Sequence, residues 1–118
     1  MNQTGASVAT LTKAPAKTAF PKAAVEKALI EGLVDAIAAE AAIRGYVVPP
    51  TPAALVKAAV HVDSLLTVDI VCTVEPIIGM KLPQHVVKTG GYASIEAAIA
   101  HVLPRIERQW NKKHGVKL

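Results

Sequence analysis

The chain contains few aromatic side chains and only one cysteine, and both scarcities narrow what it can be. Phenylalanine, tyrosine and tryptophan make up 3% of its 118 residues, whereas hydrophobic residues make up 52%. A core built from Ala, Val, Leu and Ile favours closely packed helices, and it leaves little for stacking on nucleic-acid bases. The single cysteine, Cys72, excludes an internal disulfide framework and fits a reducing compartment, so we expect a cytoplasmic protein.

Long apolar runs are also missing from the sequence. No run approaches the roughly 18 to 20 residues that a membrane-spanning helix needs. We expect no secretory signal, because the lysines of the N-terminal segment are not followed by an unbroken apolar stretch. Residues 1–20 are rich in Ala, Thr, Ser and Lys without apolar periodicity, which predicts a disordered tail. A mitochondrial transit peptide is the alternative for this acid-free segment, although it contains no arginine.

The net charge of +4 is distributed unevenly along the chain. The basic excess belongs to residues 1–25 and 104–118, whereas residues 26–103 contain more acidic than basic side chains. A mildly acidic body argues against a folded domain built to bind nucleic acid, so no nucleic-acid partner is expected. We therefore predict a helical domain over 21–103, preceded by the disordered tail and followed by a basic helical extension or tail over 104–118.

The first half of the predicted fold consists of one long and one short helix. Apolar residues recur at a spacing of four over 21–44, which predicts an amphipathic helix that Gly45 ends. Thr51 followed by proline is typical of an N-cap and a first helical residue, so a short helix is expected over 52–59.

The second half contains two further long helices separated by a weak helical turn. Residues 64–75 carry aliphatic side chains at helical spacing, and Pro76 should end or bend this helix because proline lacks a backbone N–H. The weak turn is expected over 84–88. A last helix is expected over 95–110, and Pro104 either kinks it or starts a new helix. The expected fold is all-α.

The most informative segment is Asp63-Ser64-Leu65, which stands at the start of the helix predicted over 64–75. A spaced set of residues follows it: Val68, Asp69, Ile70, Val71, Gly79, Met80, Leu82, Pro83 and the run Ser94-Ile95-Glu96-Ala97-Ala98-Ile99. With these residues the chain resembles the acyl carrier and peptidyl carrier protein family over about residues 22–103. The resemblance implies an acyl-carrier-like four-helix bundle with long helices I, II and IV, a short helix III and flexible basic tails.

The resemblance also implies a function. In that family a serine hydroxyl is joined to 4′-phosphopantetheine, whose thiol carries acyl intermediates as thioesters. Ser64 is then the attachment site of a carrier that is not itself an enzyme. Asp63 is implied to be the acidic neighbour recognised by the phosphopantetheinyl transferase and its metal, and Leu65 to face partner enzymes. A helix N-terminus independently favours a phosphate on Ser64, because its free N–H groups and dipole stabilise negative charge.

The implied partners are the phosphopantetheinyl transferase and the enzymes that load and process acyl groups. The pathway is expected to be lipid or fatty acid biosynthesis, or the synthesis of a polyketide or nonribosomal peptide. We expect a monomer. No metal site is expected, because the histidines lack the spacing of metal ligands and no cysteine pair supports them.

Two further groups of residues complete the predicted site. A bundle lined by aliphatic side chains can part to admit an acyl chain. The proposed lining residues are Val68, Val71, Val74, Ile78 and Ile99. The residues expected to face partners are Leu66, Asp69, Cys72 and Glu75.

The acidic face that the family presents on its second helix is reduced in this chain. Leu66 stands where a polar residue is common, Pro76 and Ile77 stand where acidic residues are frequent, and Lys81 reverses a charge. These departures favour a specialised carrier with partly apolar partner contacts. The alternative is a carrier-fold helical interaction module that is not pantetheinylated. A third hypothesis is binding to nucleic acid or a membrane surface through the basic tails, residues 1–20 and 104–118. Docking of the basic end that contains Trp110 to an acidic partner or a membrane surface is a related alternative.

Overall fold

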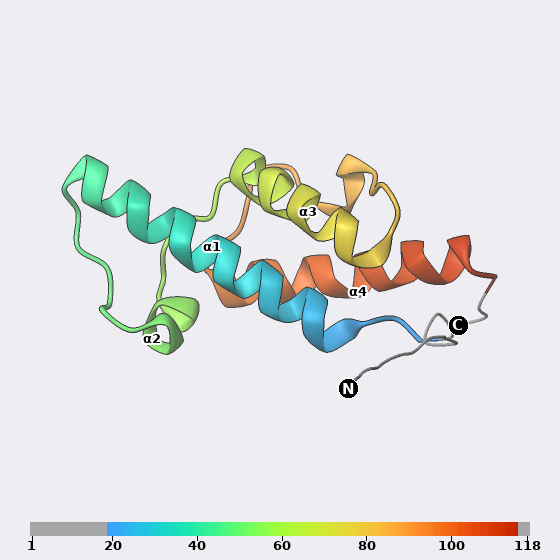
Figure 1. Cartoon of the computed structure of the whole chain (residues 1–118). Coiled ribbons are helices and arrows are strands. Elements are labelled where there is room, and N and C mark those ends of the chain that lie inside the picture. The colour runs from blue at the N-terminus through green and yellow to red at the C-terminus, as the bar shows by residue number, and fades with distance from the viewer. Residues whose placement is uncertain (1–18, 116–118) are drawn as a thin grey trace, which may run out of the picture.

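The computed structural model describes residues 19–115, which form a bundle of α-helices (Figure 1). The elements are α1 (Lys22–Arg44), α2 (Pro52–Lys57), α3 (Ser64–Ile78), a 3₁₀ turn η2 (Gln84–Val86) and α4 (Ile95–Lys113). Within residues 19–115 there is no strand, and the single β-type pairing is an isolated antiparallel bridge between Val62 and Tyr92. The predicted all-α bundle of three long helices and one short helix is confirmed.

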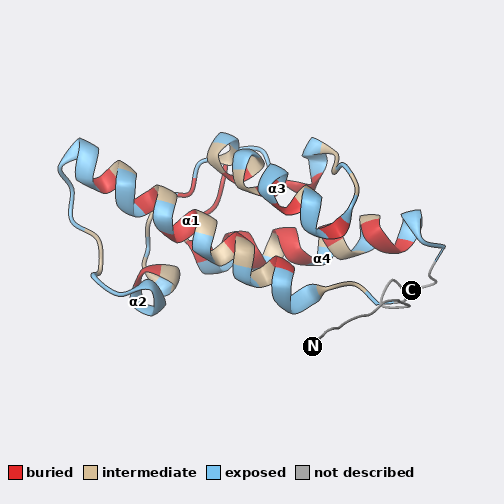
Figure 2. Cartoon of the chain, in the orientation of Figure 1, coloured by how far each residue is buried: buried red, intermediate tan, exposed pale blue. Residues whose placement is uncertain are grey.

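Helix α1 is the central element of the bundle. It packs against α3 on one side and α4 on another, while the short α2 lies across α1 and α4 (Figure 1). The faces that the helices turn toward one another are buried, whereas the outer faces and most of α2 are exposed (Figure 2). The spacing of four in α1 places its apolar residues on the face that packs against both neighbouring helices.

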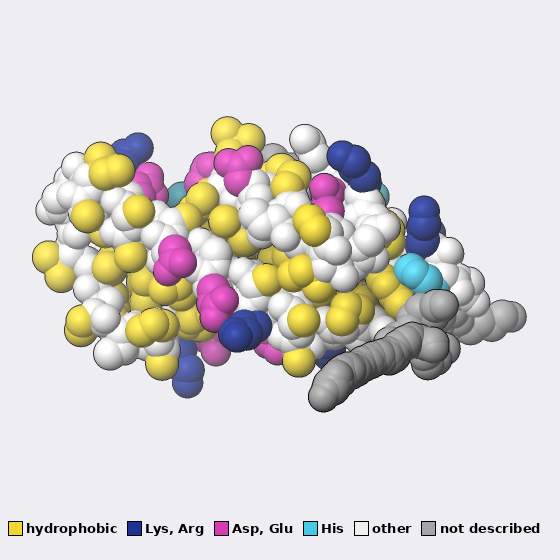
Figure 3. All heavy atoms as spheres, viewed as in Figure 1, with side chains coloured by type: hydrophobic (Ala, Val, Ile, Leu, Met, Phe, Trp, Pro, Cys, Tyr) yellow, Lys and Arg dark blue, Asp and Glu magenta, His cyan; other side chains and the backbone are white. Residues whose placement is uncertain are grey.

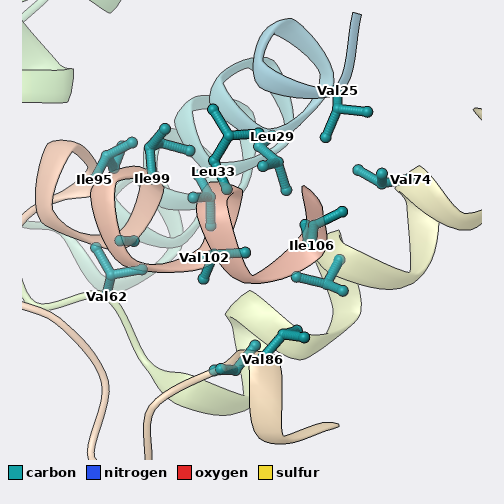
Figure 4. Close-up of a cluster of buried hydrophobic side chains, with 14 of the residues drawn as sticks. Val25, Leu29, Leu33, Val62, Val74, Val86, Ile95, Ile99, Val102 and Ile106 are labelled. Carbon is teal, nitrogen blue, oxygen red and sulfur yellow. The ribbon is translucent and has the colours of Figure 1, made fainter. Parts of the chain in front are cut away.

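The core is aliphatic and draws on every element (Figure 4). Its largest fully buried side chains are Val25, Leu29, Leu33 and Ile37 of α1, Thr67 and Val74 of α3, Val86 of η2, Ile95, Val102 and Ile106 of α4, and Val62 of the segment before α3. Burying a Val, Leu or Ile side chain contributes roughly 1.5 to 3 kcal/mol relative to leaving it in water.

A glycine sets how closely α1 and α3 approach. A Cβ atom built on Gly32 would lie 2.8 Å from Cγ2 of Ile70 on α3, which is closer than real Cβ atoms come. Because Ile70 is β-branched, its Cγ2 cannot move away without a change of rotamer. Gly32 therefore allows α1 and α3 to pack closely at Ile70, although a glycine lowers the helix propensity of α1.

The caps of the first two helices follow their sequence signals. Gly45 adopts a left-handed conformation (φ 79°) at the end of α1, and its N–H donates to the carbonyl of Ala41. Thr51 caps α2, with its hydroxyl accepting from the N–H of Ala54 at 3.3 Å. Helix α2 ends at Lys57 rather than at the predicted residue 59, because Ala58 already has an extended backbone.

Two internal prolines lie inside their helices. The sequence predicted that Pro76 would end or bend the helix expected over 64–75, and α3 continues through Pro76 to end at Ile78; α4 continues through Pro104 to Lys113. A proline leaves the carbonyl four residues earlier without its helical donor. Pro76 and Cys72, like Pro104 and Ala100, are exposed residues.

The weak helical turn predicted over 84–88 is present but shorter. Only Gln84–Val86 form a 3₁₀ turn within that range, and the short α-helix of the bundle is α2, which was predicted over 52–59. Pro83 precedes this turn and Val87 has an extended backbone, which leaves no room for a second helical turn.

The C-terminal part of α4 belongs to the core. The boundary predicted after residue 103 falls inside this continuous helix, and Ile106 and Trp110 beyond it are 0% and 3% exposed. Trp110 packs against Phe20 with 6.0 Å between ring centroids and stacks on His114 at 3.9 Å. The tryptophan is thus a core residue, and it is not free to insert into a membrane surface.

None of the helices in residues 19–115 combines the length and the apolar character that crossing a membrane requires. The predicted tail over 1–20 lies outside the described residues up to residue 18, and so do residues 116–118.

Candidate functional site

Ser64 is the first residue of α3, and its neighbour Asp63 performs the capping. Asp63 Oδ2 accepts hydrogen bonds from the N–H groups of Leu65 at 3.0 Å and Leu66 at 3.3 Å. Among the side-chain hydrogen bonds of residues 19–115, none involves Ser64 Oγ, and Ser64 is half-exposed. The serine therefore has a defined position in the helix, and its hydroxyl makes no capping hydrogen bond.

A buried threonine, Thr67, stabilises the first turn of α3. Thr67 is 1% exposed, and its hydroxyl donates to the carbonyl of Asp63 at 2.9 Å. The same carbonyl accepts the backbone N–H of Thr67 at 3.0 Å. Since a buried hydroxyl without a partner costs about 1–3 kcal/mol, this bond ties the first turn of α3 firmly to its cap.

The loop before α4 is anchored next to Ser64. Val62 N donates to the carbonyl of Tyr92 at 2.8 Å, and Tyr92 N donates to the carbonyl of Val62 at 2.9 Å. Gly91 has a φ of 82°, and a Cβ atom there would overlap the carbonyl oxygen of Val62 and crowd Ser64 N. Only glycine fits this conformation and this approach, so Gly91 brings residues 88–92 against the start of α3.

Tyr92 links that loop to α4. Its hydroxyl accepts from the backbone N–H of Lys88 at 2.7 Å and bonds Nδ1 of His101 at 2.8 Å. Burial lowers the pKa of His101 below 6.5, and the charges of Arg105 and Lys88 lower it further. In the neutral form of His101 the tautomer decides which of the two groups donates in this hydrogen bond. The hydrogen bond between Tyr92 and His101 thus attaches the loop of residues 88–92, which lies against the start of α3, to α4.

A pocket of about 250 Å³ opens beside Ser64 between α3 and the segment after η2. It is lined by Ser64, Leu65, Val68, Gln84, His85, Val87, Lys88 and Thr89. The lining contains a lysine and a histidine but no acidic residue. The surroundings of the serine hydroxyl therefore differ in charge from the mildly acidic body of the domain.

A second pocket, of about 230 Å³, continues along α3 away from Ser64. Its walls are the aliphatic residues Val68, Val71, Leu82, Val86 and Val87, together with Cys72, Glu75, Lys81, Pro83 and Gln84. The two pockets share Val68, Gln84 and Val87, so they form one groove between α3 and residues 81–89. We call this the α3 groove.

The predicted acyl-lining residues divide between the groove and the core. Val68 and Val71 line the α3 groove. Val74, Ile78 and Ile99 are 0%, 7% and 8% exposed and belong to the packed core instead. A chain lying in the groove thus meets the first two residues directly, and it reaches the other three only if the helices part.

The residues predicted to face partners also differ in position. Leu65 is 73% exposed, and Asp69 and Cys72 are exposed on the same helix. Glu75 is half-buried, and its Oε2 accepts the backbone N–H of Leu82 at 2.7 Å, so it fastens the groove wall to α3.

Leu66 is half-buried against the core and faces the opposite side of α3. It lines a wide surface hollow with Ala36, Ala39, Glu40, Ile43, Arg44, His61 and Asp63. Ser64 and Asp63 therefore open onto different hollows, one on each side of the helix start.

Sequence reasoning missed the wall of the groove. His85, Val87 and Lys88 received no role, although the turn that carries them was expected. The available signal was the placement of this short, partly basic segment between Pro83 and the glycine pair. That signal does not show which helix the segment contacts, because the contact is made by residues distant in sequence.

A phosphopantetheine arm fits the groove in chemical character, with one correction. The expectation was that free helix N–H groups would hold its phosphate, but Asp63 occupies the N–H groups of Leu65 and Leu66. The half-exposed Ser64 hydroxyl is suited to carry the phosphate, and the aliphatic part of the groove suits an apolar chain. Residues 19–115 contain no group of three His, Cys, Asp or Glu side chains arranged to hold a metal ion.

Comparison with family models, with curated proteins and with solved structures found no match to this chain.

Proposed function

We propose that the protein is a carrier that holds acyl or related intermediates as thioesters on a 4′-phosphopantetheine arm attached to Ser64. The observation that carries this proposal is the position of the Ser64 hydroxyl. It stands on the first residue of α3, outside the cap, half-exposed, at one end of the α3 groove. A serine that served only to start the helix would use its own oxygen as the cap, and here Asp63 has that task.

Attachment requires a transferase and coenzyme A. Ser64 Oγ forms a new bond to the phosphorus of the pantetheine phosphate, and the phosphoanhydride bond of coenzyme A breaks. Adenosine bisphosphate leaves with the electrons of that bond, and a base of the transferase takes the hydroxyl proton. Once attached, the arm supplies a thiol for acyl transfer, while the chain's own residues position and shield it. Val68 and Val71 then offer the apolar surface on which an acyl chain rests.

The deciding experiment is the intact mass of the full chain after incubation with a broad-specificity phosphopantetheinyl transferase and coenzyme A. We expect a gain of one phosphopantetheinyl group in the wild-type chain and none in Ser64→Ala. Ser94→Ala is the matched control, because Ser94 also stands at a helix start, with its hydroxyl accepting from Ala97 N at 3.0 Å. Absence of the gain in folded wild-type protein, or a gain that persists in Ser64→Ala, overturns the proposal.

The second candidate is a helical interaction module without the arm. It is favoured by exposed apolar side chains at the end of α1 and in the following loop, where Ile43 and Val47 are 85% and 94% exposed. Figure 3 shows hydrophobic side chains gathered over this end of α1 and over α2. Ile43 lines the hollow that contains Asp63, so the same face would meet a partner in either function. Pantetheinylated protein from native cells would exclude this candidate.

A further inference from the structure

The structure assigns a phosphate subsite beside Ser64, formed by His85 and Lys88, that holds the phosphodiester of an attached arm. This inference rests on the proposed function and extends it, since it names residues of this chain that would recognise the anionic end of the arm. The ligand class is a phosphodiester monoanion joined to Ser64 Oγ.

The charge of the pocket is the first argument. His85 and Lys88 share the lining with Ser64, and no Asp or Glu belongs to that lining. Over residues 26–103 acidic side chains outnumber basic ones, so a pocket without acids is a local reversal of the domain's charge. Cationic donors form the stronger class of hydrogen bond to phosphate oxygens.

The second argument is that the usual donors are occupied. Asp63 Oδ2 takes the N–H groups of Leu65 and Leu66, and its negative charge opposes a phosphate at those groups. Asp63 also lines the hollow on the other side of the helix start, away from the pocket of His85 and Lys88. A phosphate on Ser64 is therefore favoured on the side where His85 and Lys88 lie.

The third argument is that the backbone of the subsite is held in place. Lys88 N donates to the hydroxyl of Tyr92 at 2.7 Å, and Lys88 Nζ lies 5.9 Å from the centroid of the same ring. Tyr92 is itself paired with Val62, which leads into Ser64. Next to His85, Val86 and Val87 are buried in the core. Both side chains thus project from a fixed wall, which lowers the conformational cost of binding.

The test is ³¹P NMR of the full chain loaded with the arm. The reference is the same loaded chain unfolded in urea, in which the phosphodiester contacts no folded site. We expect the folded wild-type resonance to be displaced from this reference and broadened. The double variant His85→Ala, Lys88→Ala should return it to the reference position. Lys22→Ala with Lys57→Ala is the matched control, because it removes cationic charge from exposed positions outside both pockets of the α3 groove and should leave the displacement unchanged.

A second readout is the rate at which an amine-reactive acetylating reagent labels Lys88. We expect at least a twofold slower rate in loaded than in unloaded protein, with no change at Lys57. Inorganic phosphate added to unloaded protein at millimolar concentration should not slow the labelling of Lys88. Slower labelling with inorganic phosphate would indicate a general anion site and would contradict a subsite specific to the attached arm. A displacement that persists in the double variant, together with a Lys88 labelling rate that is the same in loaded and unloaded protein, overturns the subsite while leaving the carrier function intact. Failure of wild-type protein to gain the arm overturns both.

Discussion

Asp63 and Ser64 are adjacent in sequence but differ in what their side chains do. The carboxylate of Asp63 is bound to two backbone N–H groups, and it faces the hollow on one side of α3. The hydroxyl of Ser64 opens onto the groove on the other side. Asp63 caps α3, and the proposed function adds recognition by the transferase. Substitutions can separate the two roles because asparagine caps a helix nearly as well as aspartate.

For Asp63→Asn we expect a free energy of unfolding close to that of the wild type and a strongly reduced rate of phosphopantetheine loading. For Asp63→Ala we expect a loss of about 1 kcal/mol from the missing cap in addition to the loading defect. Urea unfolding and the time course of intact mass measure the two effects. If Asp63→Asn is loaded at the wild-type rate, the charge of Asp63 has no role in recognition.

Leu65 is a large apolar side chain that the fold does not use, since it is 73% exposed. Leu65→Ala should leave the urea midpoint unchanged and slow the transfer of acyl groups to or from the loaded chain by partner enzymes. Val74→Ala is the contrasting variant, because Val74 is buried in the core outside the lining of the α3 groove and its truncation should lower the midpoint. Equal transfer rates for Leu65→Ala and wild-type protein would remove Leu65 from the partner surface.

At the scale of elements, the loop between η2 and α4 decides whether the groove exists. Gly90 and Gly91 both have positive φ, but only at Gly91 does an added Cβ meet other atoms. Gly90→Ala should cost roughly 1–2 kcal/mol from the left-handed backbone alone. Gly91→Ala should cost more than Gly90→Ala and should break the Val62–Tyr92 bridge, as seen in urea unfolding and amide exchange at Tyr92. Equal effects of the two substitutions would mean that the close approach is unimportant.

The link between Tyr92 and His101 makes this loop sensitive to acid. Because the folded-state pKa of His101 lies below the value of 6.5 expected when unfolded, the unfolded chain binds more protons near and below that pH. The contribution of His101 is full above pH 6.5 and is lost as the pH falls through the lowered pKa. His101→Gln should therefore flatten the fall in unfolding midpoint between about pH 7 and pH 5. A fall as steep in the variant as in the wild type would assign the acid sensitivity to other groups.

The sequence predicted the elements better than the groove, and the reason is the range of the interactions involved. The caps at Gly45 and Thr51 depend on nearby residues, and these predictions were correct. The sequence predicted that Pro76 ends or bends α3 but did not predict that the helix continues to Ile78, because the tolerance of an internal proline depends on which face of the helix packs against the core. The roles of Glu75 and Lys88 depend on partners at Leu82 and Tyr92 that no periodicity reveals.

At the scale of the whole molecule, α4 unites the bundle with the end of the chain. Its C-terminal half carries Ile106 and Trp110 into the core, and Trp110 also contacts Phe20 ahead of α1. The basic side chains of this half, such as Arg108 and Lys112, lie on exposed positions of the same helix. Hence these basic side chains belong to a helix that the core requires, and the C-terminal half of α4 is not a separable tail.

A chain truncated after Leu103 should fail to unfold cooperatively, whereas a chain truncated after Gly115 should match the full chain. Losing Ile106 and Trp110 removes contributions of about 2–5 and 3–5 kcal/mol, which together rival the 5–15 kcal/mol stability of a typical domain. Urea unfolding followed by circular dichroism measures both. A cooperative transition near the wild-type midpoint in the shorter chain would show that the domain ends at residue 103.

The central claim is that the hydroxyl of Ser64 carries the arm, and mass spectrometry of the protein isolated from its own cells tests it most directly. The account predicts that the peptide containing Ser64 bears phosphopantetheine, with part of the population acylated on the thiol. Recovery of that peptide only in unmodified form, from cells whose transferase is active on other carriers, would contradict it.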